Sequence, residues 1–127
     1  STEYFGGMNA PAAEQAGSAV RVDATGLNLE YLALAQIVVA SATWDGSSLS
    51  VQVKGSGARS IALPDPTNLE PGFELLVIDA LGNSAAGNIT IDPSGSGTIN
   101  GAGTLVLSAN YASARLVWIS AGAWVRA

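Results

Sequence analysis

The clearest structural signal in the sequence is the stretch FELLVID at residues 73–79. It is an almost continuous apolar run, which is typical of a central strand that is buried on both faces. Upstream of it, Leu49, Val51 and Val53 alternate with polar residues, the pattern of a strand with one buried face. We therefore expect residues 73–79 to form the centre of a β-sheet.

Turn residues divide the rest of the chain into short segments. From residue 45 onward they recur about every 8 to 12 positions, the spacing of all-β domains. The strand-like segments between them are 49–53, 60–63, 73–79, 89–91, 98–99, 105–107, 116–119 and 124–126. With one more strand upstream, we predict eight or nine short strands and almost no helix. The predicted fold class is all-β, an antiparallel β-sandwich or barrel-like roll.

The segment just before these strands is ambiguous. Residues 27–31 alternate as in a strand, whereas Tyr31, Leu34 and Val38 share one face of a helix. The run of β-branched residues that follows favours a strand. We expect a short irregular or helical piece that ends at Leu34, and then a strand over about residues 36–44.

The N-terminal residues 1–26 have no hydrophobic period and are rich in glycine and small residues. They nevertheless hold Tyr4, Phe5 and Met8, and aromatic and methionine side chains are enriched in surfaces buried between chains. We therefore divide the chain into an extended N-terminal arm, residues 1–26, and a single β-rich domain, residues 27–127. The three large side chains are predicted to bind a partner or a neighbouring subunit. The alternative is that they fold back on the core of their own chain.

The composition excludes several classes of function. The chain has 5 basic and 10 acidic residues, and the basic ones are scattered, so neither a nucleic acid nor a membrane is an expected partner. Histidine and cysteine are absent, which removes the usual general base and the commonest metal ligands. We expect no catalytic residues, no cofactor and no metal site. Charged residues make up only 12% of the chain, which indicates that part of its surface is covered in an assembly.

Several acidic residues stand next to turn residues. Asp45 precedes a glycine and Asp92 precedes a proline, and such side chains usually accept hydrogen bonds from the nearby backbone. Asp79, Asn83 and Asp92 also contain oxygen ligands that suit calcium, but they lack the clustered spacing of a calcium loop. We therefore assign these residues to turns.

Three tryptophans allow either a packing or a ligand-binding interpretation. Trp118 lies in an apolar strand and Trp124 near the end of the domain, so both are predicted to pack in the core or in a trimer interface. A groove that exposed Trp44, Trp118 or Trp124 would instead favour sugar binding.

The C-terminal half contains a series of short strand and turn motifs. They are SIALP at 60–64, PGF at 71–73, VID at 77–79, Gly82, ITI at 89–91, TING at 98–101, LVL at 105–107, YASARL at 111–116 and SAGAW at 120–124. In this order they resemble a β-module of tailed-bacteriophage structural proteins, which occurs in head decoration (cement) proteins and in tail and neck fibre domains. The resemblance covers about residues 58–126.

The resemblance implies a passive structural role in a virion. It suggests a homotrimeric decoration protein that is made in the bacterial host cytoplasm, binds the major capsid protein and stabilises the outer surface of the capsid. A tail, neck or head fibre component with receptor or carbohydrate binding is the alternative, and a non-viral binding module is a third possibility. Because fold analogy does not decide function, all three stay open at this point.

Overall fold

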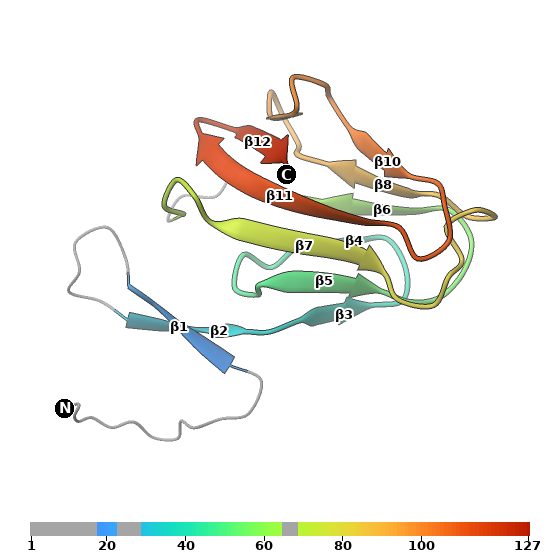
Figure 1. Cartoon of the computed structure of the whole chain (residues 1–127), viewed down its shortest axis with the longest axis horizontal. Helices are drawn as coiled ribbons and strands as arrows, with labels where there is room; N and C mark the ends of the chain where they lie inside the picture. Colours follow the sequence, from blue (N-terminus) through green and yellow to red (C-terminus); the bar gives the residue numbers. More distant parts are fainter. Residues whose placement is uncertain (1–17, 23–28, 65–68) are drawn as a thin grey trace.

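The computed structural model describes residues 18–22, 29–64 and 69–127, which form twelve β-strands and no helix (Figure 1). The strands are β1 (Ser18–Val22), β2 (Leu29–Ala33), β3 (Gln36–Val38), β4 (Ala42–Thr43), β5 (Ser50–Val53), β6 (Arg59–Ala62), β7 (Glu74–Asp79), β8 (Ile89–Asp92), β9 (Thr98–Ile99), β10 (Leu105–Leu107), β11 (Ser113–Ser120) and β12 (Ala123–Arg126). The prediction of an all-β fold is confirmed, although the strands are more numerous than expected. The arm residues Tyr4, Phe5 and Met8 lie outside the described residues.

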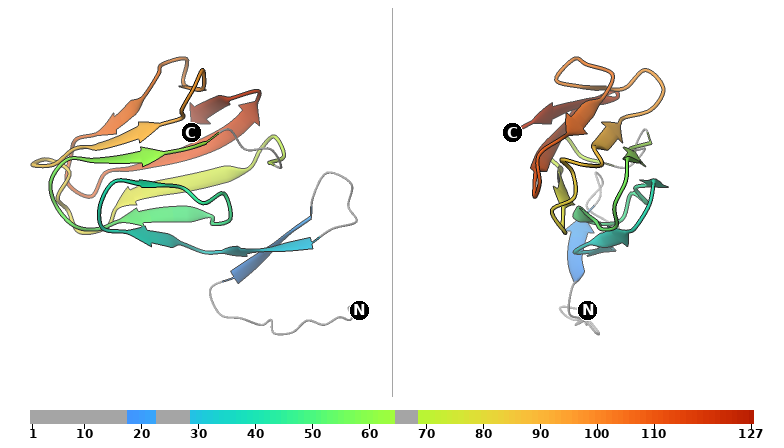
Figure 2. Two further views of the ribbon diagram at one scale, coloured as in Figure 1. Left: turned by 180° about the vertical axis from the view of Figure 1, so that it is seen from behind. Right: turned by 90° about the vertical axis from the view of Figure 1, so that its right-hand side faces the viewer.

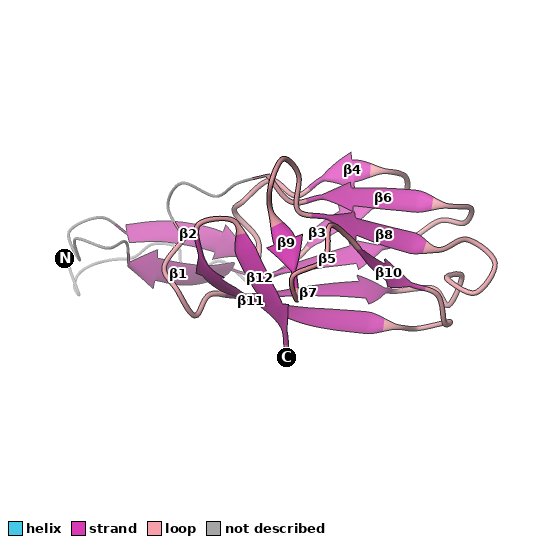
Figure 3. Cartoon of the chain, turned by 90° about the horizontal axis from the view of Figure 1, so that it is seen from above, coloured by secondary structure: helices cyan, strands magenta, loops and turns pink. Residues whose placement is uncertain are grey.

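From β3 to β10 the strands alternate between two sheets that lie face to face (Figures 2 and 3). One sheet has six strands in the order β3-β5-β7-β11-β12-β9, and the other has four in the order β10-β8-β6-β4. β1 and β2 form a separate two-stranded sheet. The two larger sheets therefore make two layers around one core.

The predicted antiparallel arrangement is correct only in part, because both sheets are mixed. β3, β5 and β7 are parallel, β4, β6 and β8 are parallel, and β9 is parallel to β12. The antiparallel pairs are β7 with β11, β11 with β12, and β8 with β10. Successive connections cross from one sheet to the other, so the next strand in the same sheet returns in the same direction. Crossing turns and hairpin turns use the same residue types at similar spacing, and the sequence pattern does not distinguish them.

The core lies between the two sheets and is almost entirely apolar. Its largest side chains are fully buried: Trp44, Trp124, Ile61, Leu63, Leu75, Ile89, Ile91, Ile99, Leu107, Leu116, Val51 and Val53. The predicted alternation is confirmed in β5 and β6, where buried residues alternate with more exposed ones. Burying one such side chain contributes about 1.5–3 kcal/mol, so this cluster is the main source of stability.

The prediction for the segment before residue 45 needs two corrections. Residues 29–33 are a strand, β2, and not helical, because they pair along their whole length with β1, a strand inside the range predicted as an irregular arm. The predicted strand over 36–44 is divided between two sheets. Val38 accepts a hydrogen bond from Lys54 in one sheet, whereas Trp44 donates to Ala62 in the other.

Strand β7 lies at the centre of the six-stranded sheet as predicted, but it is not buried on both faces. Leu75, Val77 and Asp79 point into the core and are buried, whereas Leu76 and Ile78 are only partly covered. The chain has no third layer on that side within the described residues. The apolar run therefore provides one core face and one outward face.

Candidate functional site

The outward face of the six-stranded sheet exposes aliphatic residues from four strands, interspersed with polar ones. Its aliphatic residues come from β3, β7, β11 and β12, and we call them the outer sheet face: Ile37, Leu76, Ile78, Val117, Ile119 and Val125. Val117 lies directly opposite Val125, whereas Gln52 lies between Ile37 and Ile78 and therefore separates them on this face. Ile37 is 57% exposed, Ile119 45% and Val125 43%. Exposed aliphatic residues that gather on one face of a sheet are typical of interaction surfaces.

The outward face of the four-stranded sheet has the opposite character. Thr43, Ser60, Thr90 and Asp92 occupy its outward positions, and Val106 is the exposed aliphatic residue there. A polar outward face is what an antiparallel or mixed sheet shows when one side meets water. Among the described residues, the outer sheet face therefore exposes more aliphatic side chains than the outward face of the four-stranded sheet.

The outer sheet face carries little net charge. Its Arg115 lies beside Glu74 of the neighbouring strand, with 3.4 Å between guanidinium nitrogen and carboxylate oxygen. Both side chains are about half exposed, and such pairs contribute little to stability. Because the two charges compensate each other, the surface around the aliphatic residues is close to neutral.

The tryptophans form an aromatic cluster at one end of the core. Trp118 and Trp124 face each other across β11 and β12 with ring centroids 5.1 Å apart, and Trp44 lies 6.1 Å from Trp124. The Trp44 indole nitrogen donates a hydrogen bond of 2.9 Å to the Ser48 hydroxyl. Trp118 is 4% exposed and Trp124 1%, so in the single chain both pack in the core. Their part in a trimer interface stays a prediction.

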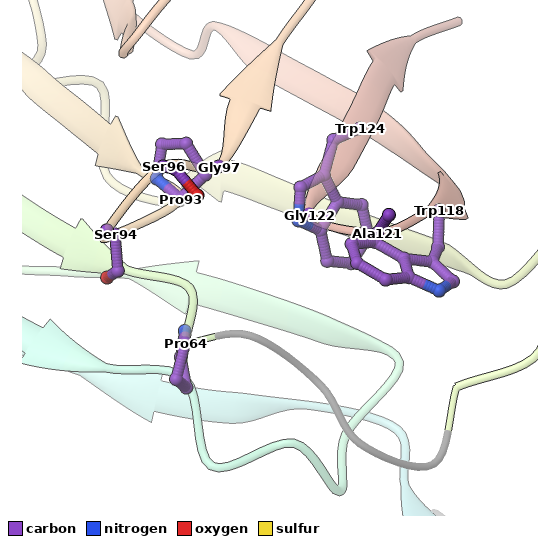
Figure 4. A pocket seen from close by; sticks show the side chains of 10 residues that line it. Pro64, Pro93, Ser94, Ser96, Gly97, Trp118, Ala121, Gly122 and Trp124 are labelled. Atoms are coloured by element: carbon purple, nitrogen blue, oxygen red, sulfur yellow. The ribbon is translucent and has the colours of Figure 1, made fainter.

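A pocket of about 360 Å³ opens beside two of these tryptophans (Figure 4). It is lined by Pro64, Pro93, Ser94, Gly95, Ser96, Gly97, Trp118, Ala121, Gly122 and Trp124. The lining residues that the structure describes include no charged side chain and only two hydroxyls, so this part of the pocket suits an apolar or neutral group. It offers little of the tryptophan ring surface on which a sugar would stack, since both indoles are almost fully buried.

Asp79 is a buried carboxylate at the end of β7. Its oxygens accept hydrogen bonds from the backbone N–H groups of Gly82 (3.0 Å), Ser84 (2.9 Å) and Tyr111 (2.9 Å). Burial alone raises the pKa of Asp79, but the hydrogen bonds from Tyr111 and Ser84 outweigh it and hold the pKa well below its ordinary value. The side chain is thus ionised, and its hydrogen bonds join two loops.

Arg59 is the buried cation of the same end of the molecule, and the sequence offered no signal for its burial. Its Nη1 donates to the carbonyl oxygens of Lys54 (3.1 Å) and Gly55 (3.0 Å), and its Nη2 donates to that of Gly87 (2.7 Å). Asn83 also donates to the Gly55 carbonyl, at 2.6 Å. Arg59 and Asn83 therefore connect the β5–β6 and β7–β8 loops, a structural function.

The turn assignments of the other acidic residues are confirmed. Asp45 accepts a hydrogen bond of 2.8 Å from the Ser47 N–H, and Asp92 accepts one of 2.9 Å from the Ser94 N–H. These bonds span two residues, as in Asx turns. Both side chains serve their own loops.

The sequence interpretation missed the outer sheet face. The signal was present, because the stretch FELLVID is apolar at both odd and even positions, and we assigned both sets to burial within one chain. A two-layer fold buries only one of them.

No group of three or more His, Cys, Asp or Glu residues in the described ranges could hold a metal ion. Nor does this part of the chain contain a helix that could span a membrane. Comparison of the sequence with protein-family models and with curated proteins finds no match.

Proposed function

We propose that this protein is a non-enzymatic structural component of a bacteriophage virion, a homotrimeric decoration protein on the outer surface of the capsid. The observation that carries the proposal is the outer sheet face, which exposes aliphatic residues from four strands, whereas the outward residues of the other sheet are mostly polar. Surfaces buried between subunits are enriched in apolar groups and depleted in charge. The low proportion of charged residues, 12%, and the resemblance of residues 58–126 to phage structural modules support the same function.

The physical task of such a protein needs no chemistry. A trimer that binds the assembled shell, and not its separated subunits, stabilises the shell by mass action. At a free concentration 100 times its dissociation constant, the stabilisation is about 2.7 kcal/mol per site. The stabilisation from the many binding sites on one shell adds up. The proposed partner at each site is the major capsid protein.

The N-terminal arm is the proposed anchor to that partner. Tyr4, Phe5 and Met8 lie within five sequence positions, so one arm presents three large apolar groups together. Three arms on a trimer would add avidity to individually weak contacts. Deletion of residues 2–12 is expected to leave folding and trimer formation intact while most attachment to heads is lost. Normal attachment of the deleted protein would refute the anchoring role.

Co-sedimentation tests the proposed function directly. Purified protein is mixed with intact phage heads and, separately, with dissociated capsid subunits, and the bound protein is measured in the pellet and by gel filtration. We expect saturable binding to heads in multiples of three copies per site and no binding to free subunits. Absence of binding to heads would refute the decoration function.

A fibre component with carbohydrate or receptor binding is the second candidate, and the observation that brings it into consideration is the uncharged pocket beside Trp118, which has room for a small neutral group. A neutral sugar that entered this pocket would change the environment of the indole rings. Titration of the protein with a panel of neutral glycans, followed by tryptophan fluorescence, therefore tests this candidate. A saturable change that is lost in Trp118→Phe would support a fibre, whereas no response to any glycan would exclude this use of the pocket.

A further inference from the structure

Tyr111 lies in the turn between β10 and β11, in a backbone conformation that is unfavourable for a large residue. The turn is closed by a hydrogen bond of 3.1 Å from the Ala112 N–H to the Ala109 carbonyl, and the φ of Tyr111, its third residue, is 62°. Glycine or asparagine is the usual residue at a turn position with positive φ. Of the four non-glycine residues with positive φ in the described ranges, Tyr111 has the largest side chain.

Burial of the side chain does not compensate for this strain. Tyr111 is 68% exposed, so its ring adds little hydrophobic stabilisation to the fold. Large residues with positive φ are true conformational outliers, and such strained residues cluster at binding sites. The exposed ring itself is therefore the feature of Tyr111 that calls for a function.

The position of the ring is fixed although the ring is exposed. The buried Asp79 carboxylate accepts the Tyr111 N–H at Oδ2 (2.9 Å) and the Gly82 N–H at Oδ1 (3.0 Å). The ring lies against Gly82, where an added Cβ would come within 2.5 Å of two ring carbons. One carboxylate thus positions both the tyrosine and the backbone that its ring contacts. A ring held in this way loses little conformational freedom when a ligand binds.

A polar group beside Tyr111 is oriented by the same loop. The Asn110 side-chain oxygen accepts a hydrogen bond of 2.9 Å from the Ala85 N–H. Because the oxygen faces the β7–β8 loop, the amide NH₂ of this exposed residue can donate to another molecule. The β7–β8 and β10–β11 loops lie at the same end of the sheets (Figure 1), and the ring and the amide contact the first of these loops at Gly82 and Ala85.

The two loops carry no charge. Residues 80–88 and 108–112 contain no Asp, Glu, Lys or Arg, and the two ionised side chains that bond to these loops, Asp79 and Arg59, are buried. A charged ligand would find no exposed counter-charge on them. A neutral sugar needs none, because its C–H groups pack on an aromatic ring and its hydroxyls exchange hydrogen bonds with amide groups.

We propose that Tyr111, Gly82 and Asn110 form a binding site for a neutral carbohydrate. The Tyr111 ring is the surface on which the sugar stacks, Asn110 donates to a sugar hydroxyl, and Gly82 positions the ring. The site is distinct from the pocket beside Trp118, because Tyr111 precedes β11 and the pocket residues Ala121 and Gly122 follow it. The inference does not depend on the decoration function.

Titration of ¹⁵N-labelled protein with neutral mono- and disaccharides of glucose, galactose, mannose and N-acetylglucosamine, followed by amide chemical shifts, tests the site. We expect saturable shifts at Gly82, Ala85 and Tyr111 with at least one probe. Tyr111→Asn should weaken this binding at least about 10-fold, since it removes the stacking surface. Tyr111→Phe keeps the ring and should retain most of the binding. Val106→Ala, at a residue of β10 that is 44% exposed, is the control and should bind as the native protein does.

Urea denaturation of the same variants separates a binding role from a structural one. Asparagine adopts positive φ readily, so Tyr111→Asn should be at least as stable as the native protein. A clear loss of stability would assign the ring a structural role and overturn the inference. Shifts confined to Gly97 and Gly122 would place the sugar in the pocket and also overturn it, as would equal binding by Tyr111→Asn or no saturable shift with any probe.

Co-sedimentation with heads keeps this inference apart from the decoration function. Native protein that binds a sugar at Tyr111 but does not bind heads contradicts only the decoration function. If no sugar binds and Tyr111→Asn loses its attachment to heads, the ring is a protein contact and the carbohydrate site is refuted.

Discussion

Asp79 shows how one ionised side chain can organise loops that are far apart in the sequence. Its carboxylate accepts hydrogen bonds from the turn that follows β7 and from Tyr111, which is 32 residues away. A neutral amide retains the shape but replaces one acceptor oxygen with a donor that faces backbone N–H groups. The charge, more than the volume, is therefore the feature that this site needs.

We predict that Asp79→Asn lowers the free energy of unfolding by about 2–4 kcal/mol, because several charge-assisted hydrogen bonds are weakened together in a buried site. Urea denaturation measures the change. Asp92→Asn is the matched control: Asp92 is exposed and accepts a bond from Ser94, so its loss should cost less than about 1 kcal/mol. Equal effects of the two variants would contradict the assignment.

The stability that Asp79 contributes should depend on pH. Its pKa in the folded state is held well below that of an unfolded aspartate, which is about 3.9. The contribution is therefore complete above about pH 4 and is lost as the pH falls toward the folded-state pKa. In urea midpoints measured from pH 7 to pH 2, the difference between the native protein and Asp79→Asn should shrink below pH 4. A constant difference over this range would show that the charge is not responsible.

At the scale of elements, loops from different turns of the chain pack closely at one end of the sheets. Gly87 of the β7–β8 loop lies so close to Gly57 of the β5–β6 loop that an added Cβ would overlap its backbone. Arg59 donates to the Gly87 carbonyl and to the carbonyl oxygens of the β5–β6 loop, so it connects the same two loops. The parallel ladders β5–β7 and β6–β8 therefore end in a joint loop layer.

Substitution of Gly87 by alanine should push the β7–β8 loop away from the β5–β6 loop. We expect Gly87→Ala to destabilise the protein by about 1–3 kcal/mol, the usual cost of overpacking against atoms that cannot move freely. Gly103→Ala is the control, since a Cβ there meets nothing within 4 Å. Thermal unfolding followed by circular dichroism compares them. If Gly103→Ala proved as damaging as Gly87→Ala, close packing of the loops would not be the cause.

At the scale of the whole molecule, the two sheets present surfaces of different kinds. The outward residues of the four-stranded sheet are mostly polar, whereas the six-stranded sheet carries the aliphatic residues of the outer sheet face. The two sheets and the separate β1–β2 sheet are seen together in Figure 3. This asymmetry is what a subunit needs if one side contacts its neighbours and the other meets solvent.

Two valines of equal exposure test this asymmetry. Val125 on the outer sheet face is 43% exposed, and Val106 on the four-stranded sheet is 44% exposed. We expect Val125→Glu to weaken self-association at least about 10-fold, because it would bury an unpaired charge, whereas Val106→Glu leaves association unchanged. Sedimentation equilibrium measures both, and urea denaturation checks that each variant folds. Equal association of the two variants would refute the assignment of the interface.

Most of the strands and turns after residue 45 could be recognised from local patterns alone, whereas β1 and β2 were not. Alternation at residues 49–53, the apolar run at 73–79 and the turn chemistry of Asp45 and Asp92 depend on neighbours within a few positions, and the structure contains them as predicted. The absence of histidine and cysteine could likewise be read directly from the sequence, and it removes the commonest general base and the commonest metal ligands.

The partners of each strand, in contrast, were decided by contacts between distant parts of the chain. Whether a turn leads back along the same sheet or across to the other depends on which partner completes the backbone hydrogen bonds, and the two cases share one turn composition. The division of residues 36–44 between two sheets and the burial of Arg59 follow from those long-range contacts. The exposure of Leu76 and Ile78 in FELLVID was also decided by the tertiary structure. Both residues are apolar in the sequence whether or not a third layer covers them. Only the two-layer arrangement places Leu76 and Ile78 on an outward face.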